Sequence, residues 1–233
     1  MPSLARRLVA EALGTFSFVF VGAAVVVVNG GFPNSGIGLL GIALAHAVAL
    51  SIMITATMTI SGGHLNPAVT IGLLAARRIS VISAVAYIIT QLAAATLAAF
   101  VVKALLPAAA VRSALVGVPV IAGSMTLGHA IGLELVLTFF LMFAVFGTAV
   151  SPDAPRVGGF GIGLVILFDI LVGGPLTGAA MNPARAFGPA VASGEWVGHI
   201  AYWVGPVVGA LLAALVWEYF LLPKGPHRRR RTD

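Results

Sequence analysis

The sequence predicts an all-α membrane protein with six transmembrane helices and two re-entrant half-helices. Three observations support this class. The chain has 233 residues, of which 60% are hydrophobic and 9% charged, and its mean hydropathy is +1.08, so an ordinary soluble domain is excluded. Six apolar stretches reach the length of about 20 residues that a bilayer crossing needs. Two further apolar stretches are too short to cross.

The six predicted spans follow one another with turn-forming residues between several of them. They lie near 4–29, 36–60, 79–105, 126–150, 157–175 and 197–222. Turn-forming residues follow the first, fourth and sixth spans, at 29–34, 151–155 and 223–226. The first apolar run continues to Val28 and contains no short apolar core with a cleavage-type motif. We therefore predict a retained first span rather than a signal peptide.

The two short apolar stretches, 67–76 and 183–192, each follow the start of an Asn-Pro-Ala triplet. The triplets are Asn66-Pro67-Ala68 and Asn182-Pro183-Ala184. Asparagine is a favoured N-cap and proline a favoured first helical residue, so each triplet predicts a helix start. Roughly ten helical residues span about 15 Å, which is half of the hydrocarbon core. Such segments must line a cavity or be buried in protein.

Three spans and a half-helix occur twice in the same order. The recurring residues are Glu11 and Thr15 with Glu134 and Thr138, Asn66 with Asn182, and Tyr87 with Tyr202. Because three is odd, the second copy enters from the opposite face, which gives an inverted repeat. We predict a first repeat at 1–115, a second at 116–223 and a basic cytoplasmic tail at 224–233. The half-helices then meet, N-terminus to N-terminus, near the membrane midplane.

Positive charge is concentrated at the C-terminal end. The formal net charge is +6, and the last ten residues hold Lys224 and the run Arg228–Arg231 against one acid, Asp233. A basic tail after a hydrophobic segment is typical of a topological anchor, so we expect no nucleic-acid partner and both termini in the cytoplasm. The short loops, the lack of cysteine and this tail favour a multi-pass protein of a prokaryotic cell (inner) membrane.

The residues around the triplets resemble the two signature loops of the aquaporins, the major intrinsic protein family. They read SGGHLNPAVT at 61–70 and GAAMNPAR at 178–185. The resemblance extends to about Leu222. It implies the aquaporin fold, a homotetramer with a pore in each protomer, and a passive channel for water and small neutral solutes. It implies no cofactor.

The two triplets have a physical role in such a channel. A helix N-terminus carries about half a positive elementary charge, so two of them facing one point repel cations, hydronium included. The side-chain amides of Asn66 and Asn182 can donate to a passing water. A water held by two donors turns its hydrogens outward and interrupts a proton-conducting chain. The alternative is that both asparagines only cap buried helices.

The resemblance assigns a selectivity filter to His46, Ile170, Ala179 and Arg185. This set is similar to the filter of plant tonoplast intrinsic proteins, in which an aliphatic side chain replaces a histidine found in strict water channels. Such a filter is wider, so ammonia, urea or hydrogen peroxide can accompany water. Glycerol facilitators tend to carry aspartate after the arginine, whereas Ala186 stands here, which favours water over glycerol.

Other ionisable residues have assigned or open roles. By resemblance, Glu11 and Glu134 brace the re-entrant loops; the rival interpretation makes them proton-coupling acids of a transporter. His64 is expected to line the cytoplasmic half of the pore. For Asp169 three explanations stay open: a subunit interface, an unidentified donor, or tuning of the filter.

Functions of other classes find less support. His129 and His199 are expected near the outer surface without a metal, because no second ligand stands at a suitable spacing. The sequence has no nucleophile set, phosphate-binding loop or HExxH motif, so we expect no enzyme. An inverted-repeat secondary transporter, a glycerol-type channel and a narrow anion channel remain as alternatives.

Overall fold

The computed structural model describes residues 2–223, and this part of the chain contains helices and loops but no strand. Its long helices are α1 (Leu4–Gly31), α2 (Gly38–Thr57), α4 (Val81–Leu105), α6 (Leu127–Val145), α7 (Phe160–Thr177) and α9 (Ala201–Val216). All six, with α6 and α9 extended to Val150 and Leu221, are long and apolar enough to cross a membrane. The predicted fold class is confirmed. The basic tail predicted at 224–233 lies outside the described residues.

Several spans begin at a side-chain cap. The hydroxyls of Ser3, Ser80 and Thr126 accept a backbone N–H from the first turn of α1, α4 and α6, respectively. Such a bond satisfies one of the N–H groups that the first turn of a helix leaves without a partner. These caps explain why the three helices begin within two residues of the predicted positions.

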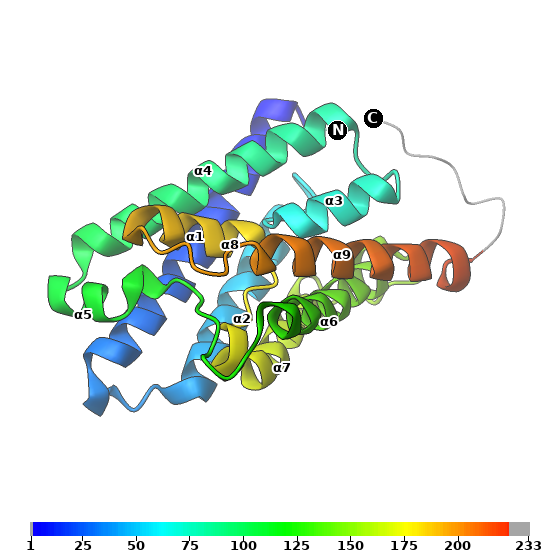
Figure 1. Ribbon diagram of the computed structural model, residues 1–233. Coiled ribbons are helices and arrows are strands. Elements are labelled where there is room, and N and C mark those ends of the chain that lie inside the picture. The colour runs from blue at the N-terminus through cyan, green and yellow to red at the C-terminus, as the bar shows by residue number, and fades with distance from the viewer. Residues whose placement is uncertain (1, 224–233) are drawn as a thin grey trace.

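The two short helices are α3 (Pro67–Ala75) and α8 (Pro183–Ser193). They begin close together near the centre of the molecule and run outward in opposite directions (Figure 1). Each begins with proline at its first position, as expected, and ends within one residue of the predicted boundary. Their starts therefore lie inside the bundle rather than at its surface.

Some elements were not predicted. The connection between α4 and α6 contains the six-residue helix α5 (Ala108–Ser113) and the 3₁₀ turn η2 (Leu115–Gly117). Another 3₁₀ turn, η1 (Pro33–Ser35), precedes α2. The π-helical turns η3 (Phe146–Val150) and η4 (Trp217–Leu221) extend α6 and α9 within the predicted spans 126–150 and 197–222, and only their π-helical form was not predicted. One or two turns are too short to show a helical periodicity in the sequence.

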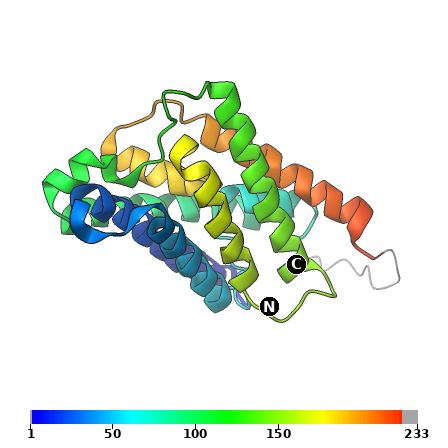
Figure 2. The same ribbon diagram turned by 90° about the horizontal axis from the view of Figure 1, so that it is seen from below.

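The packing interleaves the two halves of the chain. α1 packs with α2 and α4, α6 with α7 and α9, and α2 with α7; α6 and α9 lie side by side in Figures 1 and 2. The half-helix α3 packs on α9, and α8 packs on α4. Glycine permits two of these approaches. A Cβ on Gly209 of α9 would overlap the Leu135 carbonyl oxygen of α6, and a Cβ on Gly188 of α8 would overlap the Ala95 carbonyl oxygen of α4. Each half-helix is thus held by a span of the other half.

Candidate functional site

The two Asn-Pro-Ala triplets meet at the centre of the molecule. The Asn66 side-chain oxygen accepts the Ala68 N–H at 2.8 Å, and that of Asn182 accepts the Ala184 N–H at 3.0 Å. Both asparagines are therefore N-caps, as predicted. Their amide nitrogens cross between the loops, because Asn66 Nδ2 donates to the Met181 carbonyl and Asn182 Nδ2 to the Leu65 carbonyl, each at 2.9 Å.

This crossing refines the expectation that each amide faces the pore. A side-chain amide has two N–H donors. One of them bonds to the opposite loop, which leaves one to face a permeant.

The acceptors of these bonds stand in unusual backbone conformations. Leu65 has φ of 50° and Met181 of 51°, in the left-handed region that non-glycine residues rarely occupy. A residue held there costs on the order of 1–3 kcal/mol and needs support from its surroundings. At both positions the strained residue directly precedes the capping asparagine and accepts the bond from the other loop. The strain is therefore part of the junction between the loops.

Glu11 supports the first loop from α1. It is fully buried. Its Oε1 accepts the Ser61 hydroxyl at 2.7 Å and the His64 N–H at 3.0 Å. Its Oε2 accepts the Leu65 N–H and Gln91 Nε2, both at 2.8 Å. Four donors thus compensate the carboxylate for the loss of water.

Glu134 supports the second loop from α6 in the same way. It too is fully buried. Its Oε1 accepts the Thr177 hydroxyl at 2.7 Å and the Ala180 N–H at 2.9 Å, and its Oε2 accepts the Met181 N–H at 2.7 Å. The strained residue of each loop is therefore tied to a buried carboxylate through its own N–H.

Two tyrosines complete the support of the loops, a role that sequence reasoning missed. Tyr87 donates to the Ser61 carbonyl and Tyr202 to the Thr177 carbonyl, each at 2.8 Å. Ser61 and Thr177 are 116 positions apart, as the triplets are, and both donate a hydroxyl to the carboxylate of their half. The spacing of 116 between Ser61 and Thr177 was the sequence signal that could have identified the two residues that the tyrosines and carboxylates bind.

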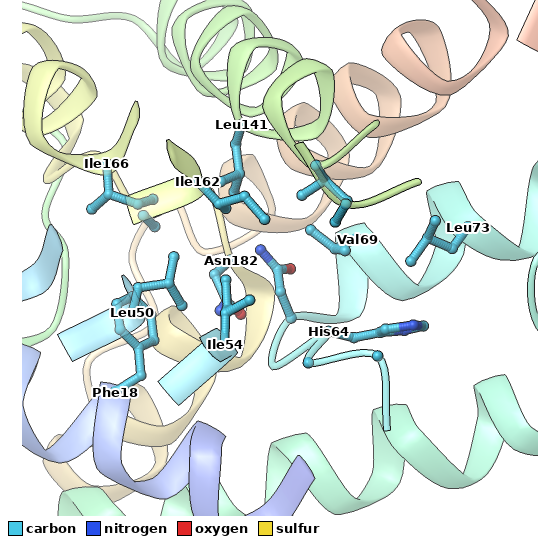
Figure 3. Close-up of a pocket in the computed structure, with 16 residues that line it drawn as sticks. Phe18, Leu50, Ile54, His64, Val69, Leu73, Leu141, Ile162, Ile166 and Asn182 are labelled. Carbon is cyan, nitrogen blue, oxygen red and sulfur yellow. The ribbon is translucent and has the colours of Figure 1, made fainter. Parts of the chain in front are cut away.

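A cavity adjoins the triplets on one side. Asn66 and Asn182 line it together with mostly apolar residues of α1, α2, α3, α6 and α7. Figure 3 shows these apolar side chains around it, with Asn182 near the middle. It offers about 30 Å³ to the centres of water-sized molecules, whereas one water needs roughly 10–15 Å³. The cavity therefore has room for about two waters.

His64 also lines this cavity. Its Nδ1 lies 3.1 Å from the Thr70 hydroxyl oxygen, and that hydroxyl donates its own hydrogen to the Asn66 carbonyl. Thr70 can therefore only accept from the histidine, which assigns the hydrogen of the neutral ring to Nδ1 and leaves Nε2 as an acceptor.

The four residues predicted for the filter are all buried, and none of them lines this cavity. His46 stands on α2, Ile170 on α7, Ala179 in the loop before α8, and Arg185 on α8. Arg185 acts electrostatically on His46. Among residues 2–223, no hydrogen bond joins Ile170 or Ala179 to His46 or Arg185, so hydrogen bonds do not establish a ring of four.

His46 and Arg185 present unpaired polar atoms within the described part of the chain. His46 Nδ1 lies 2.9 Å from the Ile42 carbonyl, to which it must donate, so Nε2 is an acceptor without a partner. Arg185 Nη1 donates to the Gly117 carbonyl at 2.9 Å, while its Nε has no partner. Gly117 lies in η2, an element that the sequence did not predict. Both atoms are buried, and His46 Nε2 faces Gly22 of α1.

His129 and His199, the other two histidines of the described residues, lie outside this centre. His129 is exposed at the start of α6. His199 accepts Trp203 Nε1 at 3.2 Å and contacts the rings of Phe187 and Trp196; burial lowers its pKa. Among residues 2–223, no three histidine or acidic side chains gather as a metal site requires.

Comparisons with known proteins agree with this architecture. The profile of a family described as major intrinsic protein matches residues 1–217. The maize protein "Aquaporin TIP4-4" (Zea mays) is 42% identical and is aligned over 98% of this chain and 91% of its own length. "Probable aquaporin TIP-type alpha" (Phaseolus vulgaris) is 44% identical over 97% and 89%.

A solved structure shares the fold. The X-ray structure of the aquaglyceroporin from Plasmodium falciparum superposes with a TM-score of 0.82, covering 94% of this chain and 97% of that one, at 24% identity. At that identity the likeness supports the architecture alone.

The relatives correct one expectation. We expected a prokaryotic inner membrane, but the similar proteins are TIP-type aquaporins of maize, Arabidopsis thaliana, bean and other plants, so that expectation is wrong. Short loops, absent cysteine and a basic tail suit any bilayer that faces a reducing compartment, and they therefore cannot distinguish one membrane from another. The multi-pass arrangement itself agrees with the six candidate spans.

Proposed function

The chain belongs to the major intrinsic protein family, and from this premise we propose that it is a passive channel that conducts water and excludes protons and ions. The observation that carries the proposal is the junction at the centre. There, two helix N-termini and two asparagine amides adjoin a cavity of about 30 Å³. The plant relatives named aquaporins support water as the main solute.

Proton exclusion follows from the same junction. Each asparagine amide keeps one N–H that is not needed by the opposite loop. A water that accepts from both must point its own hydrogens away, which breaks the hydrogen-bonded chain along which protons move. The N-termini of α3 and α8 add a positive potential at the same point, and this opposes any cation.

We further propose that His46, Ile170, Ala179 and Arg185 form the selectivity filter. Their burial, the electrostatic proximity of Arg185 to His46, and the unpaired atoms His46 Nε2 and Arg185 Nε support this role. A permeant that can both donate and accept replaces its lost water contacts there. Ammonia, urea and hydrogen peroxide meet this condition, so we propose them as additional solutes.

Light-scattering shrinkage of liposomes that carry the purified protein tests the main proposal. We expect water permeability well above that of empty vesicles, with a low activation energy and a stable proton gradient. Permeability equal to that of empty vesicles would refute the water channel. A gradient dissipated by the protein would favour the proton-coupled transporter instead.

Two variants test the filter. Arg185→Val is expected to keep water permeability within a few-fold while it raises proton leak, since it removes the one cation assigned to the filter. Ile170→His is expected to narrow the filter and lower urea uptake more than water flow. Ile162→Val, in the cavity wall away from the filter, is the control. Unchanged solute selectivity in both filter variants would contradict the assignment.

The organisation of the chain is also a proposal. We infer inverted repeats at 1–115 and 116–223, supported by the opposite directions of α3 and α8 and by matching contacts of Glu11 and Glu134. We infer a homotetramer as well, by resemblance to the aquaporins. Mass measurement in detergent tests the assembly. No catalytic role is proposed, because the family described as major intrinsic protein accounts for the chain as a channel.

A further inference from the structure

Asp169 is an ionisable residue in the middle of α7 that the channel mechanism does not use. Its side chain is 0% exposed. Neither Oδ1 nor Oδ2 has a hydrogen-bond partner among the described residues. Complete burial within one protomer rules out the explanation that it faces another subunit. The absence of a partner rules out a protein donor in the described part of the chain.

Asp169 continues a stripe of α7 that faces α6. Thr177, two turns along the helix, donates to Glu134 of α6. A Cβ added to Gly173, one turn along, would lie 2.6 Å from Leu137 Cδ1 of the same helix. Residues four apart share a helix face, so Asp169 lies on the α6 side, at about the level of Leu141. Leu141 lines the cavity.

The neighbouring residue connects this position to the filter. Asp169 directly precedes Ile170, which we assign to the filter. Asp169 also lies one turn beyond Ile166, another residue that lines the cavity. Any movement of α7 against α6 at this level therefore displaces both Ile170 of the proposed filter and Ile166 of the cavity wall.

No positive charge is placed to balance an ionised Asp169 among the residues that the structure describes. Two helices pack along α7, namely α2 and α6. The titratable residues of α6 are Glu134 and His129. A negative charge on Glu134 disfavours ionisation of Asp169, and His129 is exposed. The one titratable residue of α2 is His46, whose Nδ1 is bonded to Ile42. A buried carboxylate without a donor or a cation is unfavourable, so the acid is held uncharged.

The first half of the chain shows what the fold requires here. Met53 of α2 stands 116 positions before Asp169, at the spacing that relates the two loops. It is apolar and packs against the hydrophobic core. The architecture therefore accommodates an uncharged side chain at this position and has no built-in partner for an ion.

We propose that Asp169 is a positioning residue for Ile170 that makes the channel sensitive to alkaline pH. In its uncharged form it packs between α6 and α7. When it ionises, the charge draws water between the two helices, displaces α7 and lowers permeability. The inference rests on the proposed channel function, and it concerns the regulation of that same pore.

The conservative variant Asp169→Asn tests the proposal, because it keeps the size and polarity of the side chain and removes its ionisation. Water permeability is measured in proteoliposomes over a range from pH 6 to about pH 10. Wild-type protein should lose permeability severalfold as the pH rises, and Asp169→Asn should keep its neutral value. Glu195→Gln, in an outer loop, is the control and should follow the wild type.

A second readout does not depend on transport. The unfolded chain ionises near the ordinary aspartate value of about 3.9, whereas the folded chain stays uncharged. Above that pH unfolding releases a proton, so stability falls as pH rises until Asp169 ionises in the folded state too. The wild-type unfolding constant in detergent micelles should grow by up to about tenfold per pH unit relative to Asp169→Asn.

The two readouts separate the possible failures. Identical pH profiles of stability for wild type and Asp169→Asn would overturn the proposal even if the protein conducts water. Divergent stability profiles with identical permeability profiles would overturn the gating role. A lack of water permeability at every pH would instead refute the proposed function. If Asp169→Asn fails to fold, Asp169→Met, which introduces the side chain found at the matching position Met53, provides the same comparison.

Discussion

The two re-entrant loops share one scaffold but differ in the side chains around it. In both, an asparagine caps the half-helix, a residue with positive φ precedes it, a buried carboxylate accepts the loop N–H groups, and a tyrosine binds the loop carbonyl. The structural atoms are thus duplicated almost one for one.

The first loop has a further layer of polar contacts that the second lacks. Gln91 donates to Glu11 and to Thr70, and Thr70 lies within hydrogen-bond distance of His64. At the matching spacings in the second half stand Pro206, Ala186 and Ala180, which offer no side-chain hydrogen bond.

The positive charge lies in the second half rather than in the first. Val69, in the wall of the cavity, corresponds to Arg185 of the second half. The first loop therefore has more internal hydrogen bonds, and the second carries Arg185 and Ala179, which we propose for the filter. In the repeat that we propose, the contacts that support the loops match, whereas the side chains beside them differ.

The largest effect is expected from variants that remove the buried carboxylate of either loop. Glu11→Leu removes the carboxylate that accepts four hydrogen bonds, and Glu134→Leu removes one that accepts three. Each unsatisfied buried donor costs about 1–3 kcal/mol. We expect both variants to lose more than about 3 kcal/mol of stability, Glu11→Leu the more. Size-exclusion profiles and thermal unfolding in detergent measure this, with Glu195→Leu as control. Equal stability of both variants and wild type would contradict the bracing role.

A smaller effect is expected from removing the additional hydrogen bonds that only the first loop has. Gln91→Leu deletes two hydrogen bonds but also an unpaired buried oxygen. We expect a loss of about 1–2 kcal/mol in unfolding free energy with water permeability retained. Thr96→Val, on the same helix, is the matched control. If Gln91→Leu abolished permeability at normal stability, this layer would belong to the conducting path.

The far ends of the half-helices offer a milder comparison. Lys103 Nζ donates to the Ala192 carbonyl at 2.7 Å, close to the C-terminus of α8. A cation there complements the helix dipole. We expect Lys103→Met to cost about 1 kcal/mol, measured by thermal unfolding, whereas Arg112→Met in α5 should not change stability. A loss equal in both variants would indicate a general effect of charge.

The smallest effect concerns the matching region of the first half. Arg78, just after α3, forms a salt bridge of 2.9 Å with Glu218. Arg78 is 39% exposed, and exposed ion pairs contribute less than about 1 kcal/mol. Arg78→Gln should therefore shift the unfolding midpoint less than Lys103→Met does. The reverse order would show that the end of α3 needs more support than that of α8.

Some features could be predicted from the sequence because they depend on local physics. The span and half-helix boundaries follow from apolar length, from Ser and Thr caps and from the Asn-Pro starts. The pairing of Glu11 with Glu134, and of the two asparagines, followed from their recurrence at similar spacings. The fold class needed no contact information beyond these patterns.

Other features depend on contacts between distant segments. One N–H of each asparagine binds the opposite loop, which could be known only once the loops were placed within hydrogen-bond distance. Arg185 binds Gly117 because η2 turns through Val116, which has φ of 58°, and no local signal marks that turn. Gln91 is one polar residue on an apolar helix, and such a residue has many possible partners.

The exchange of packing between the halves has a consequence for biosynthesis. α3 packs on α9, the last span to be made, and Asn66 bonds to Met181 in the second loop. The N-terminal half emerges from the ribosome first, and its loop can already bond to Glu11 and Tyr87. The contacts of α3 with α9 and of Asn66 with the second loop form only after those later segments have been translated. The junction between the two loops is therefore completed late, although half of its residues are synthesised early.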